Sequence, residues 1–243
     1  REIITRIERA EYGLRGMRSA MIAQPRMQRS QFEAVVGSRD LWVEFRGVRG
    51  FGFIERVERP DLDRFIAARR AEGSPDFQVR TAGDAPDLFV IRYIEPLATN
   101  RQALGFDLGS DPHRREALAT AAAQGAATLT PRVTLVQDER RGAGLVYVLP
   151  LHENNADGST ERGRLIGFVH APIVAAEILG DLQSFVEFLL DIRLYEGRAA
   201  EGRPIYDTQR AIDPHEVARP DDSFSHRLFT AERQFSLGGR LFT

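Results

Sequence analysis

The stretch from Phe89 to Leu108, with the sequence FVIRYIEPLATNRQALGFDL, constrains the fold more than any other. Its first residues are aromatic or β-branched and predict a strand, which Pro96 ends because proline has no N–H for a sheet ladder. Asn100 suits the turn or helix cap that follows, and a second extended piece starts at Gly105. Glu95 therefore stands at a strand end beside a short connection, where pockets commonly place their polar contacts.

Residues 1–36 predict one long helix that is kinked near Pro25, because an interior proline ends or bends a helix. Its apolar residues follow in alternating steps of four and three and form a heptad seam: Ile3, Ile7, Ala10, Leu14, Met17 and Met21. The helix either packs on its own domain or pairs with a second copy in a parallel dimer. We adopt the dimeric stalk as the expectation for residues 1–40, although Gly13 and Gly16 each weaken a helix by about 1 kcal/mol.

Further along, apolar patterning and turn residues predict a mixture of helices and strands. We expect helices at 60–72 and 111–124, and strands at 50–56, 77–79, 89–95, 132–138, 144–151 and 164–173. The second helix has the clearest ends, with Asp111 as its cap, Pro112 in its first turn and Gly125 after its last residue. Because the last three strands form a meander with the helices on one side, this part predicts an α+β layout close to a PAS-like sensor fold.

From residue 174 onward the pattern repeats on a smaller scale. It predicts a helix at 174–182, a loop at 214–220, and strands at 186–197, 203–207, 223–229 and 233–243. We therefore expect an α+β chain in which a long N-terminal stalk helix precedes two PAS-like modules with antiparallel sheets. The expected boundaries are 1–40 for the stalk, 41–173 for the larger module and 174–243 for the smaller one.

Composition and motifs exclude several kinds of function. The net charge of −2 argues against a nucleic-acid binder that depends on phosphate contacts. The absence of cysteine excludes thiol catalysis, disulfides and cysteine-bound zinc. The histidines show no metal-binding spacing and are expected to be structural or exposed: His113, His152, His170, His215 and His226. Since Glu95 and Asp107 have no identifiable acid–base partner, and no nucleotide-binding or nucleophile motif is present, we expect no enzyme, cofactor or metal.

The apolar runs are too short to cross a membrane. The longest have about eight residues, whereas a spanning helix needs roughly 18–20. The sequence has no signal peptide, and it starts within the first predicted helix and ends within the last predicted strand. We expect the chain to be a piece of a longer protein.

Several segments together resemble the CHASE domain. The longest is FVIRYIEPLATNRQALGFDLGSDPHRREALATAAAQGAATLTPRVTLVQ at 89–137, and the others are YGLRGMRSA at 12–20, GFGFIERV at 50–57, EGSPDFQV at 72–79 and GFV at 167–169. CHASE domains are extracytoplasmic sensors of membrane receptors, with a stalk helix, two PAS-like modules and a transmembrane helix on each side in the parent chain. The resemblance therefore implies a parent receptor that is a histidine kinase, a diguanylate cyclase or an adenylate cyclase.

The resemblance also implies a ligand pocket in the larger module. Plant members bind cytokinins, which are adenine derivatives, and the matching positions here are Glu95 for the carboxylate on the purine edge, Thr130 and Gly167. We expect the remaining pocket contacts from Tyr93, Leu104, Phe106, Leu118, Val133, Leu135 and Tyr147. Pro96 departs from the plant pattern, which leaves the ligand open to other small molecules. The competing interpretation pairs Glu95 with Arg92, Arg101 or a backbone N–H of the turn.

These observations lead to an expected function and an alternative. We expect an extracytoplasmic sensor domain that binds an unknown small molecule, with purine-like compounds such as a cytokinin among the candidates, and that signals as a parallel homodimer through its stalk. Helices outside this chain would anchor the receptor to the membrane, and nucleic acid is not an expected partner. The alternative is a structural or protein-interaction module that sets dimerisation, or docks a partner protein, without a ligand.

Overall fold

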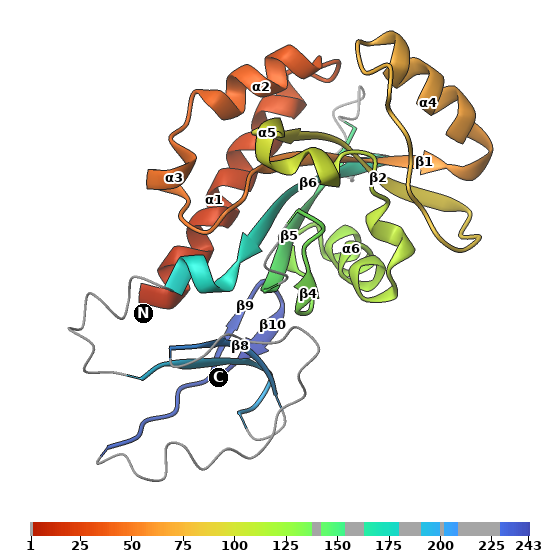
Figure 1. The fold of residues 1–243 in the computed structure, drawn as a ribbon. Coiled ribbons are helices and arrows are strands. Elements are labelled where there is room, and N and C mark those ends of the chain that lie inside the picture. Colours follow the sequence, from red (N-terminus) through yellow and green to blue (C-terminus); the bar gives the residue numbers. More distant parts are fainter. Residues whose placement is uncertain (1, 138–141, 154–162, 180–190, 200–201, 209–228) are drawn as a thin grey trace.

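The structure is a computed structural model that describes residues 2–137, 142–153, 163–179, 191–199, 202–208 and 229–243. Two antiparallel sheets organise these residues (Figure 1). The larger sheet has helices on both of its faces, and the smaller sheet is built from the C-terminal part of the chain. This arrangement agrees with the predicted α+β class and its N-terminal helix.

The larger sheet is made of six strands in the order β2-β1-β6-β5-β3, with β4 also paired to β5. Their bounds are Phe51–Glu58 for β1, Asp87–Glu95 for β2, Thr128–Leu129 for β3, Val133–Thr134 for β4, Ala143–His152 for β5 and Leu165–Val174 for β6. β6 pairs with β5 on one side and with β1 on the other. Because side chains alternate along a strand, β6 presents neighbouring residues to opposite faces of the molecule.

An irregularity in β2 decides which way its C-terminal half faces. Phe53 of β1 pairs with Tyr93, but the next residue, Ile54, pairs with Ile91, so Arg92 is an extra residue on β2. Such a bulge shifts the alternation by one position. As a result Ile91 packs in the core on one side of the sheet, whereas Tyr93 packs in the core on the other side.

The N-terminal helix packs on the chain's own sheet. It is interrupted at Pro25 as predicted, and three helices result: α1 at Glu2–Ala23, α2 at Arg29–Gly37 and α3 at Leu41–Glu44. The heptad seam is buried from Ile7 to Met21 in the same apolar cluster as Tyr147 of β5. The seam therefore packs on the chain's own domain, because the residues expected to pair two stalks are already buried within one chain.

Helix α6 lies on the opposite face of the larger sheet from α1 (Figure 1). It extends over Pro112–Gln124, with the predicted ends: the Asp111 side chain accepts a backbone N–H, and Gly125 adopts a left-handed φ of 66°. Leu118 of this helix is buried in a cluster with Val148 of β5. The sheet thus separates a core under α1 from a core under α6.

Short helices connect the strands of the larger sheet. Their bounds are Arg59–Asp61 for η1, Leu62–Ala71 for α4, Leu97–Asn100 for α5, Arg101–Ala103 for η2 and Leu108–Ser110 for η3. The strand predicted at 77–79 is wrong, because Phe77 packs its ring against Phe65 and the chain makes only one bridge nearby, from Arg80 to Phe106. The strand predicted at 132–138 is reduced to the two residues of β4.

The smaller sheet has the strand order β8-β7-β10-β9. Its strands are β7 at Arg193–Glu196, β8 at Arg203–Asp207, β9 at Phe235–Leu237 and β10 at Arg240–Phe242. The single strand predicted at 233–243 is instead a hairpin, since Gly238 and Gly239 turn the chain with positive φ angles of 53° and 75°. The helix predicted at 174–182 starts at Ala175. Residues 138, 180–182, 186–190, 214–220 and 223–228 of the predicted elements lie outside the described residues.

The two sheets are joined by hydrogen bonds. Arg132, next to β4, donates from Nη1 to the carbonyl of Pro204 in β8 over 2.6 Å. Leu129 of β3 donates its backbone N–H to the carbonyl of Gly238 over 2.9 Å. Leu194 and Phe242 of the smaller sheet also belong to the apolar cluster under α1, so the cores of the two sheets are continuous.

Candidate ligand-binding site

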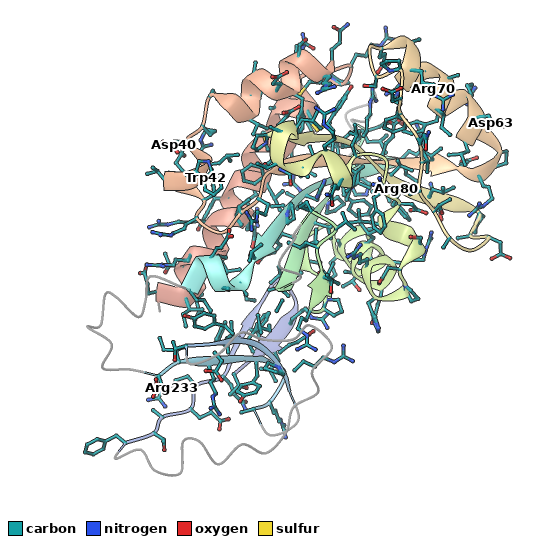
Figure 2. All side chains as sticks on the ribbon, viewed as in Figure 1. Asp40, Trp42, Asp63, Arg70, Arg80 and Arg233 are labelled. Carbon is teal, nitrogen blue, oxygen red and sulfur yellow. The ribbon has the colours of Figure 1, made fainter. Side chains whose placement is uncertain are left out.

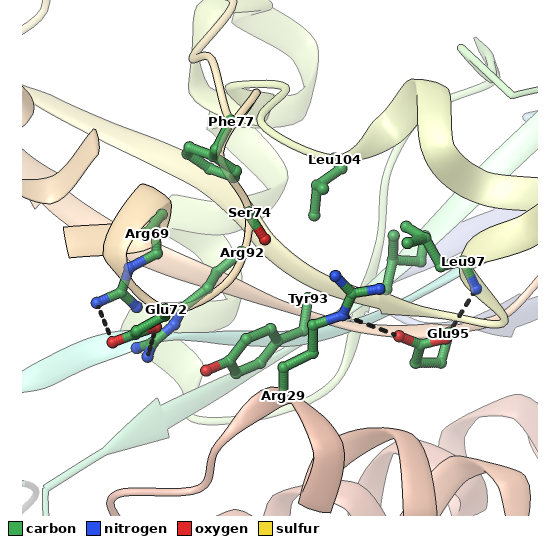
Figure 3. A pocket seen from close by; sticks show the side chains of 11 residues that line it. Arg29, Arg69, Glu72, Ser74, Phe77, Arg92, Tyr93, Glu95, Leu97 and Leu104 are labelled. Carbon is green, nitrogen blue, oxygen red and sulfur yellow. Dashed lines mark hydrogen bonds and ion pairs between the residues drawn. The ribbon is translucent and has the colours of Figure 1, made fainter. Parts of the chain in front are cut away.

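The carboxylate at the end of β2 is held by its own turn and by α2. Glu95 Oε2 accepts a hydrogen bond from the backbone N–H of Leu97 over 2.8 Å, and Oε1 lies 3.8 Å from Nε of Arg29 (Figure 3). Burial raises the pKa of Glu95 despite these contacts. The turn N–H is one of the partners foreseen for Glu95, whereas its basic neighbour is Arg29 rather than Arg92 or Arg101.

A charged cleft surrounds this position, and we call it the Glu95 cleft. Besides Glu95 it is lined by two other predicted site residues, Tyr93 and Leu104, and by Arg69, Glu72 and Arg92. Glu72 pairs with both arginines, at 2.9 Å from Arg69 and 3.3 Å from Arg92 (Figure 3). The charges of the cleft are therefore largely paired with one another, which leaves few of them for a ligand.

A second pocket lies on the other face of the sheet, under α6, and we call it the His170 pocket. Its apolar wall comes from Ile91, Phe106, Leu108, Leu135 and Val146, and its polar groups are Arg114, Gln137 and His170. The cavity itself is about 20 Å³, room for about one water molecule, and the empty space of about 290 Å³ around it includes open solvent. Ligand sites are typically concave, mostly apolar and equipped with a few polar groups, and this pocket has that composition.

His170 is the least ordinary residue of the pocket. It lies in the middle of β6 and is only 1% exposed, and neither of its ring nitrogens has a hydrogen-bond partner among the described residues. Gly52 of the neighbouring strand makes room for the ring, because a Cβ at that position would lie 2.2 Å from Nε2. Burial lowers the pKa of His170 to about 3, so the imidazole is neutral at physiological pH and offers one donor and one acceptor.

Arg114 is the second buried polar group of the pocket. It is 7% exposed, and its Nη2 donates to the carbonyl of Thr134 over 2.8 Å, whereas its Nε has no hydrogen-bond partner among the residues that the structure describes. The guanidinium lies over the ring of Phe106, 5.1 Å from the ring centre. Burial lowers the pKa of Arg114, while the carboxylate of Asp111 acts in the opposite direction.

The structure distributes the predicted site residues over several places. Phe106 and Leu135 line the His170 pocket, and Leu118 and Val133 are buried in the apolar cluster beside it. Tyr93, Glu95 and Leu104 lie in the Glu95 cleft on another part of the sheet. The bulge at Arg92 explains this separation, since regular alternation would have placed Tyr93 and Glu95 on the same face as Ile91.

The remaining three predicted residues have structural partners. Thr130 accepts the backbone N–H of Val146 on its Oγ1 over 2.9 Å. Tyr147 packs under α1, on the face away from the His170 pocket, where burial and the carboxylates of Glu11 and Glu8 raise its pKa. A Cβ on Gly167 would lie 2.0 Å from the carbonyl oxygen of Ile54, so the glycine permits the close approach of β1 and β6.

Sequence reasoning missed His170 and Arg114, although a signal for each exists. His170 alternates with Phe168, which is buried on the same face of β6, so it occupies a core position of a strand. Arg114 precedes Ala117, Leu118 and Ala121 by three, four and seven residues, so it belongs to the buried stripe of α6. A polar residue at a position where apolar residues are buried is informative, because polar side chains are seldom buried without a reason.

Neither a metal site nor a membrane span is found in the described residues. No group of three or more histidine or acidic residues there is arranged to hold a metal ion. Among the helices of the described part of the chain, none is both long and apolar enough to cross a membrane.

The fold is shared with a solved receptor structure. The extracellular ligand binding receptor from Desulfohalobium retbaense DSM5692 aligns with 99% of this chain at a TM-score of 0.59 and 12% identity. The aligned part is 37% of that receptor, so this chain spans little more than a third of its length. The ligand-binding domain of the Pseudomonas aeruginosa PAO1 amino-acid chemoreceptor PctC, in complex with GABA, aligns with 99% of this chain and 91% of its own, at a TM-score of 0.47 and 11% identity.

Sequence comparison gives the family directly. The CHASE domain model matches residues 25–206, which is most of the chain, and the chain therefore belongs to the CHASE family. CHASE domains are sensors rather than enzymes. The match begins after α1 and continues into β8, whereas the resemblance was expected from about residue 12 to residue 172. A search of the curated proteins found no match.

Proposed function

We propose that this chain is the extracytoplasmic sensor domain of a membrane receptor and that it binds a small molecule in the His170 pocket. The CHASE family match supports the sensor role. The observation that carries the choice of pocket is His170, a fully buried imidazole that has no hydrogen-bond partner in the described part of the chain. A buried polar group left unpaired costs about 1–3 kcal/mol, and a ligand that pairs with it offsets that cost.

Strand β6 offers a direct route from this pocket to the N-terminal helix. Phe168 and His170 face the core under α6, whereas Val169 and Ala171 face the core under α1. A ligand that repositions β6 would therefore press on the packing of α1 through adjacent residues of one strand. For signalling, the ligand must bind one arrangement of these elements better than the other, because equal affinity shifts no population.

A homodimer remains part of the proposal, but it needs a different surface from the heptad seam. The outward side of α1 and α3 exposes large apolar side chains, with Tyr12, Trp42 and Val43 at 71%, 65% and 73% exposure. Trp42 points away from the body of the molecule (Figure 2). We place the contact between the two copies there, next to the helix that packs on β6.

The proposal keeps the predicted layout but moves the ligand from Glu95 to the His170 pocket. The modules are 41–173 and 174–243, with the boundary where β6 ends, and the strand order of the larger sheet supports a PAS-like assignment. A purine held by Glu95 is the ligand that the resemblance implies. The contacts of Glu95 with Leu97 and Arg29 favour the His170 pocket instead.

The alternative function is a structural or protein-interaction module without a small-molecule ligand. Two observations favour it: the cavity of about 20 Å³ in the His170 pocket is far smaller than the roughly 300–1,000 Å³ of ordinary ligand sites, and Tyr12, Trp42 and Val43 are exposed. In that case the exposed side chains would dock a partner or only set the distance between two copies.

Thermal-shift screening distinguishes the two functions. Purines, amino acids and small carboxylates are tested on the 243-residue chain and on the variant His170→Leu. A ligand at 100 times its Kd adds about 2.7 kcal/mol, which corresponds to a rise in Tm of roughly 5–10 °C. We expect at least one class to raise the Tm of the wild type but not of His170→Leu. If no compound raises the Tm of the wild type, or if each raises the Tm of both proteins equally, the proposal that the His170 pocket binds a ligand is wrong.

A further inference from the structure

A third cavity lies between helix α6 and the smaller sheet, and we call it the Glu196 cleft. Its walls come from α6, from the segment between β3 and β4, and from the smaller sheet, and they include His113, Glu116, Pro131, Glu196, Arg203 and Arg240. The cavity of about 500 Å³ is partly open to solvent, whereas the Glu95 cleft and the His170 pocket hold about 20 Å³ each. Ligand sites usually measure roughly 300–1,000 Å³ and often lie where two structural units meet, so this cleft has the size and the position of one.

Glu196, at the end of β7, is a fixed part of this cleft. Its side chain is 11% exposed, its Oε1 accepts a hydrogen bond from Nε of Arg240 over 2.7 Å, and its Oε2 accepts the backbone N–H of Arg132 over 2.9 Å. The first contact lies within the smaller sheet, whereas the second joins that sheet to the segment beside β4. Because both oxygens are occupied and Arg240 balances the charge, Glu196 holds the two sheets together and leaves the binding of a ligand to other groups.

Two further charged side chains line the cleft, one on each side of it. Arg203 of β8 stands directly opposite Glu196 of β7, so both side chains lie on one face of the smaller sheet. That face is turned toward the larger sheet, since Leu194, two residues before Glu196, is buried in the core that the sheets share. Glu116 faces the same cavity from α6.

Arg203 and Glu116 are opposite in charge but do not meet. Among the described residues neither of them forms a hydrogen bond or an ion pair, with each other or with a third group, and both are exposed to the cleft's solvent. The cavity thus has an unused guanidinium on the side of the smaller sheet and an unused carboxylate on the side of α6. Complementary charge on a ligand is what such a pair of groups selects.

We propose that the Glu196 cleft is a second ligand site, beyond the function proposed for the His170 pocket, and that it binds a small zwitterion. The carboxylate of the ligand pairs with Arg203, whose guanidinium presents parallel N–H donors to two oxygens, and the ammonium of the ligand pairs with Glu116. A simple anion or cation would satisfy only one of these groups. Since Arg203 and Glu116 do not reach each other, several atoms separate the two charges of the ligand, as they do in a dipeptide.

Such a ligand connects the two parts of the chain. It contacts α6, which packs on the larger sheet, and β8 of the smaller sheet at the same time. Its contacts therefore add to the hydrogen bonds that Arg132 makes with Glu196 and with Pro204 across the same junction.

The test compares zwitterions with analogues that lack one of the two charges. Isothermal titration calorimetry on the 243-residue chain uses alanyl-alanine, its N-acetyl derivative and its amide, and likewise 6-aminohexanoate, hexanoate and hexylamine. We expect each zwitterion to bind at least about tenfold more tightly than either analogue, because each analogue loses one charge-assisted contact. Arg203→Gln should remove the advantage over the analogues without a carboxylate, and Glu116→Gln the advantage over those without an ammonium. Arg64→Gln, on α4 and 80% exposed, is the matched control and should keep both.

Each outcome either supports the second site or overturns it. Arg203 and Glu116 are exposed, so both variants should keep the Tm of the wild type, which thermal unfolding checks. The inference is overturned if the singly charged analogues bind as tightly as the zwitterions, or if no zwitterion binds up to about 10 mM. It is also overturned if both variants keep the full preference. Binding that His170→Leu abolishes, and that neither variant weakens, would overturn the second site while supporting the function proposed for the His170 pocket.

Discussion

At the scale of single residues, the central feature is a histidine in a position built for an apolar side chain. His170 has strands on both sides and a glycine opposite, Gly52, that clears the space for its ring. A leucine there would fill a similar volume without an unpaired polar group. Because the histidine lowers stability and offers hydrogen bonds in the pocket, its presence is best explained by binding.

The first prediction concerns how much the buried His170 lowers the free energy of unfolding. The native pKa of about 3 lies below the ordinary value of 6.5, so between these values the unfolded chain binds a proton that the native state does not. Native stability therefore falls as the pH drops from about 6.5 towards 3, by up to about 1.4 kcal/mol per pH unit. His170→Leu should be more stable at pH 7 by about 1–3 kcal/mol and lose this pH dependence. Urea unfolding from pH 7 to pH 4 measures both, and parallel curves for the two proteins would contradict the assignment.

The second prediction concerns Glu95. Its pKa is raised, so the native state holds the proton more tightly than the unfolded chain and gains stability as the pH falls through the range just above 4.5. Glu95→Gln keeps an acceptor for the N–H of Leu97 and removes the buried charge. We expect a change in unfolding free energy of less than about 1 kcal/mol at pH 7 and no change in ligand affinity. If calorimetry shows that Glu95→Gln binds the ligand much more weakly than the wild type, the ligand binds in the Glu95 cleft.

The sequence predicted part of the site, and one backbone feature explains the rest. Leu118, Val133 and Leu135 were expected to lie together, and their apolar periodicity brings them to one face. Glu95 was expected beside them, but the extra residue Arg92 turns the end of β2 to the other face. A bulge of this kind depends on pairing between distant segments, which residue-by-residue alternation cannot reveal.

At the scale of elements, α1 depends on a close approach to the sheet at one of its two glycines. A Cβ on Gly13 would lie 2.3 Å from the ring of Phe51, whereas a Cβ on Gly16 would have no neighbour within 4 Å. The two residues stand in the same helix and have the same intrinsic propensity. They therefore form a matched pair that separates packing from propensity.

The third prediction follows from this pair. Gly16→Ala should stabilise the chain by about 0.5–1 kcal/mol, because alanine favours a helix over glycine. Gly13→Ala gains the same propensity but must displace Phe51, and we expect a net loss of about 1–3 kcal/mol. Thermal and urea unfolding measure both variants, and equal effects of the two would mean that α1 does not pack as described.

The periodicity of the heptad seam predicts a helix with one apolar face, but it does not predict what that face packs against. The alternating steps of four and three predicted an amphipathic helix, and α1 is one. The partner of its apolar face could not be inferred, because a second helix and the chain's own sheet bury the same residues. The strands β5 and β6 and helix α6 were easier to predict, since their signals are local: continuous apolar runs, a cap at Asp111 and a left-handed Gly125.

At the scale of the whole molecule, two sheets share one continuous core with α1. The hydrogen bonds of Arg132 to Pro204 and of Leu129 to Gly238 tie the smaller sheet to the larger one. A change at β6 can thus reach both the N-terminal helix and the C-terminal sheet. Pairing of two copies along the outward side of α1 would bring such changes together at one interface.

The fourth prediction concerns this pairing. Tyr12 is exposed and takes no part in the core, so Tyr12→Arg should leave the Tm unchanged. Two arginines facing each other across an isologous contact repel, and we expect the dimer Kd to rise at least about tenfold. Analytical ultracentrifugation at concentrations up to about 1 mM measures it. A dimer that Tyr12→Arg does not weaken, or a wild type that stays monomeric throughout this range, would contradict the proposed surface.

A crystal structure of the chain purified from its own source, so that a natural ligand is retained, tests the central claim most directly. Electron density for an organic molecule is expected in the His170 pocket, with one polar atom within hydrogen-bond distance of the His170 ring. Density there that only ordered water explains, or an organic molecule bound in the Glu95 cleft instead, would contradict it.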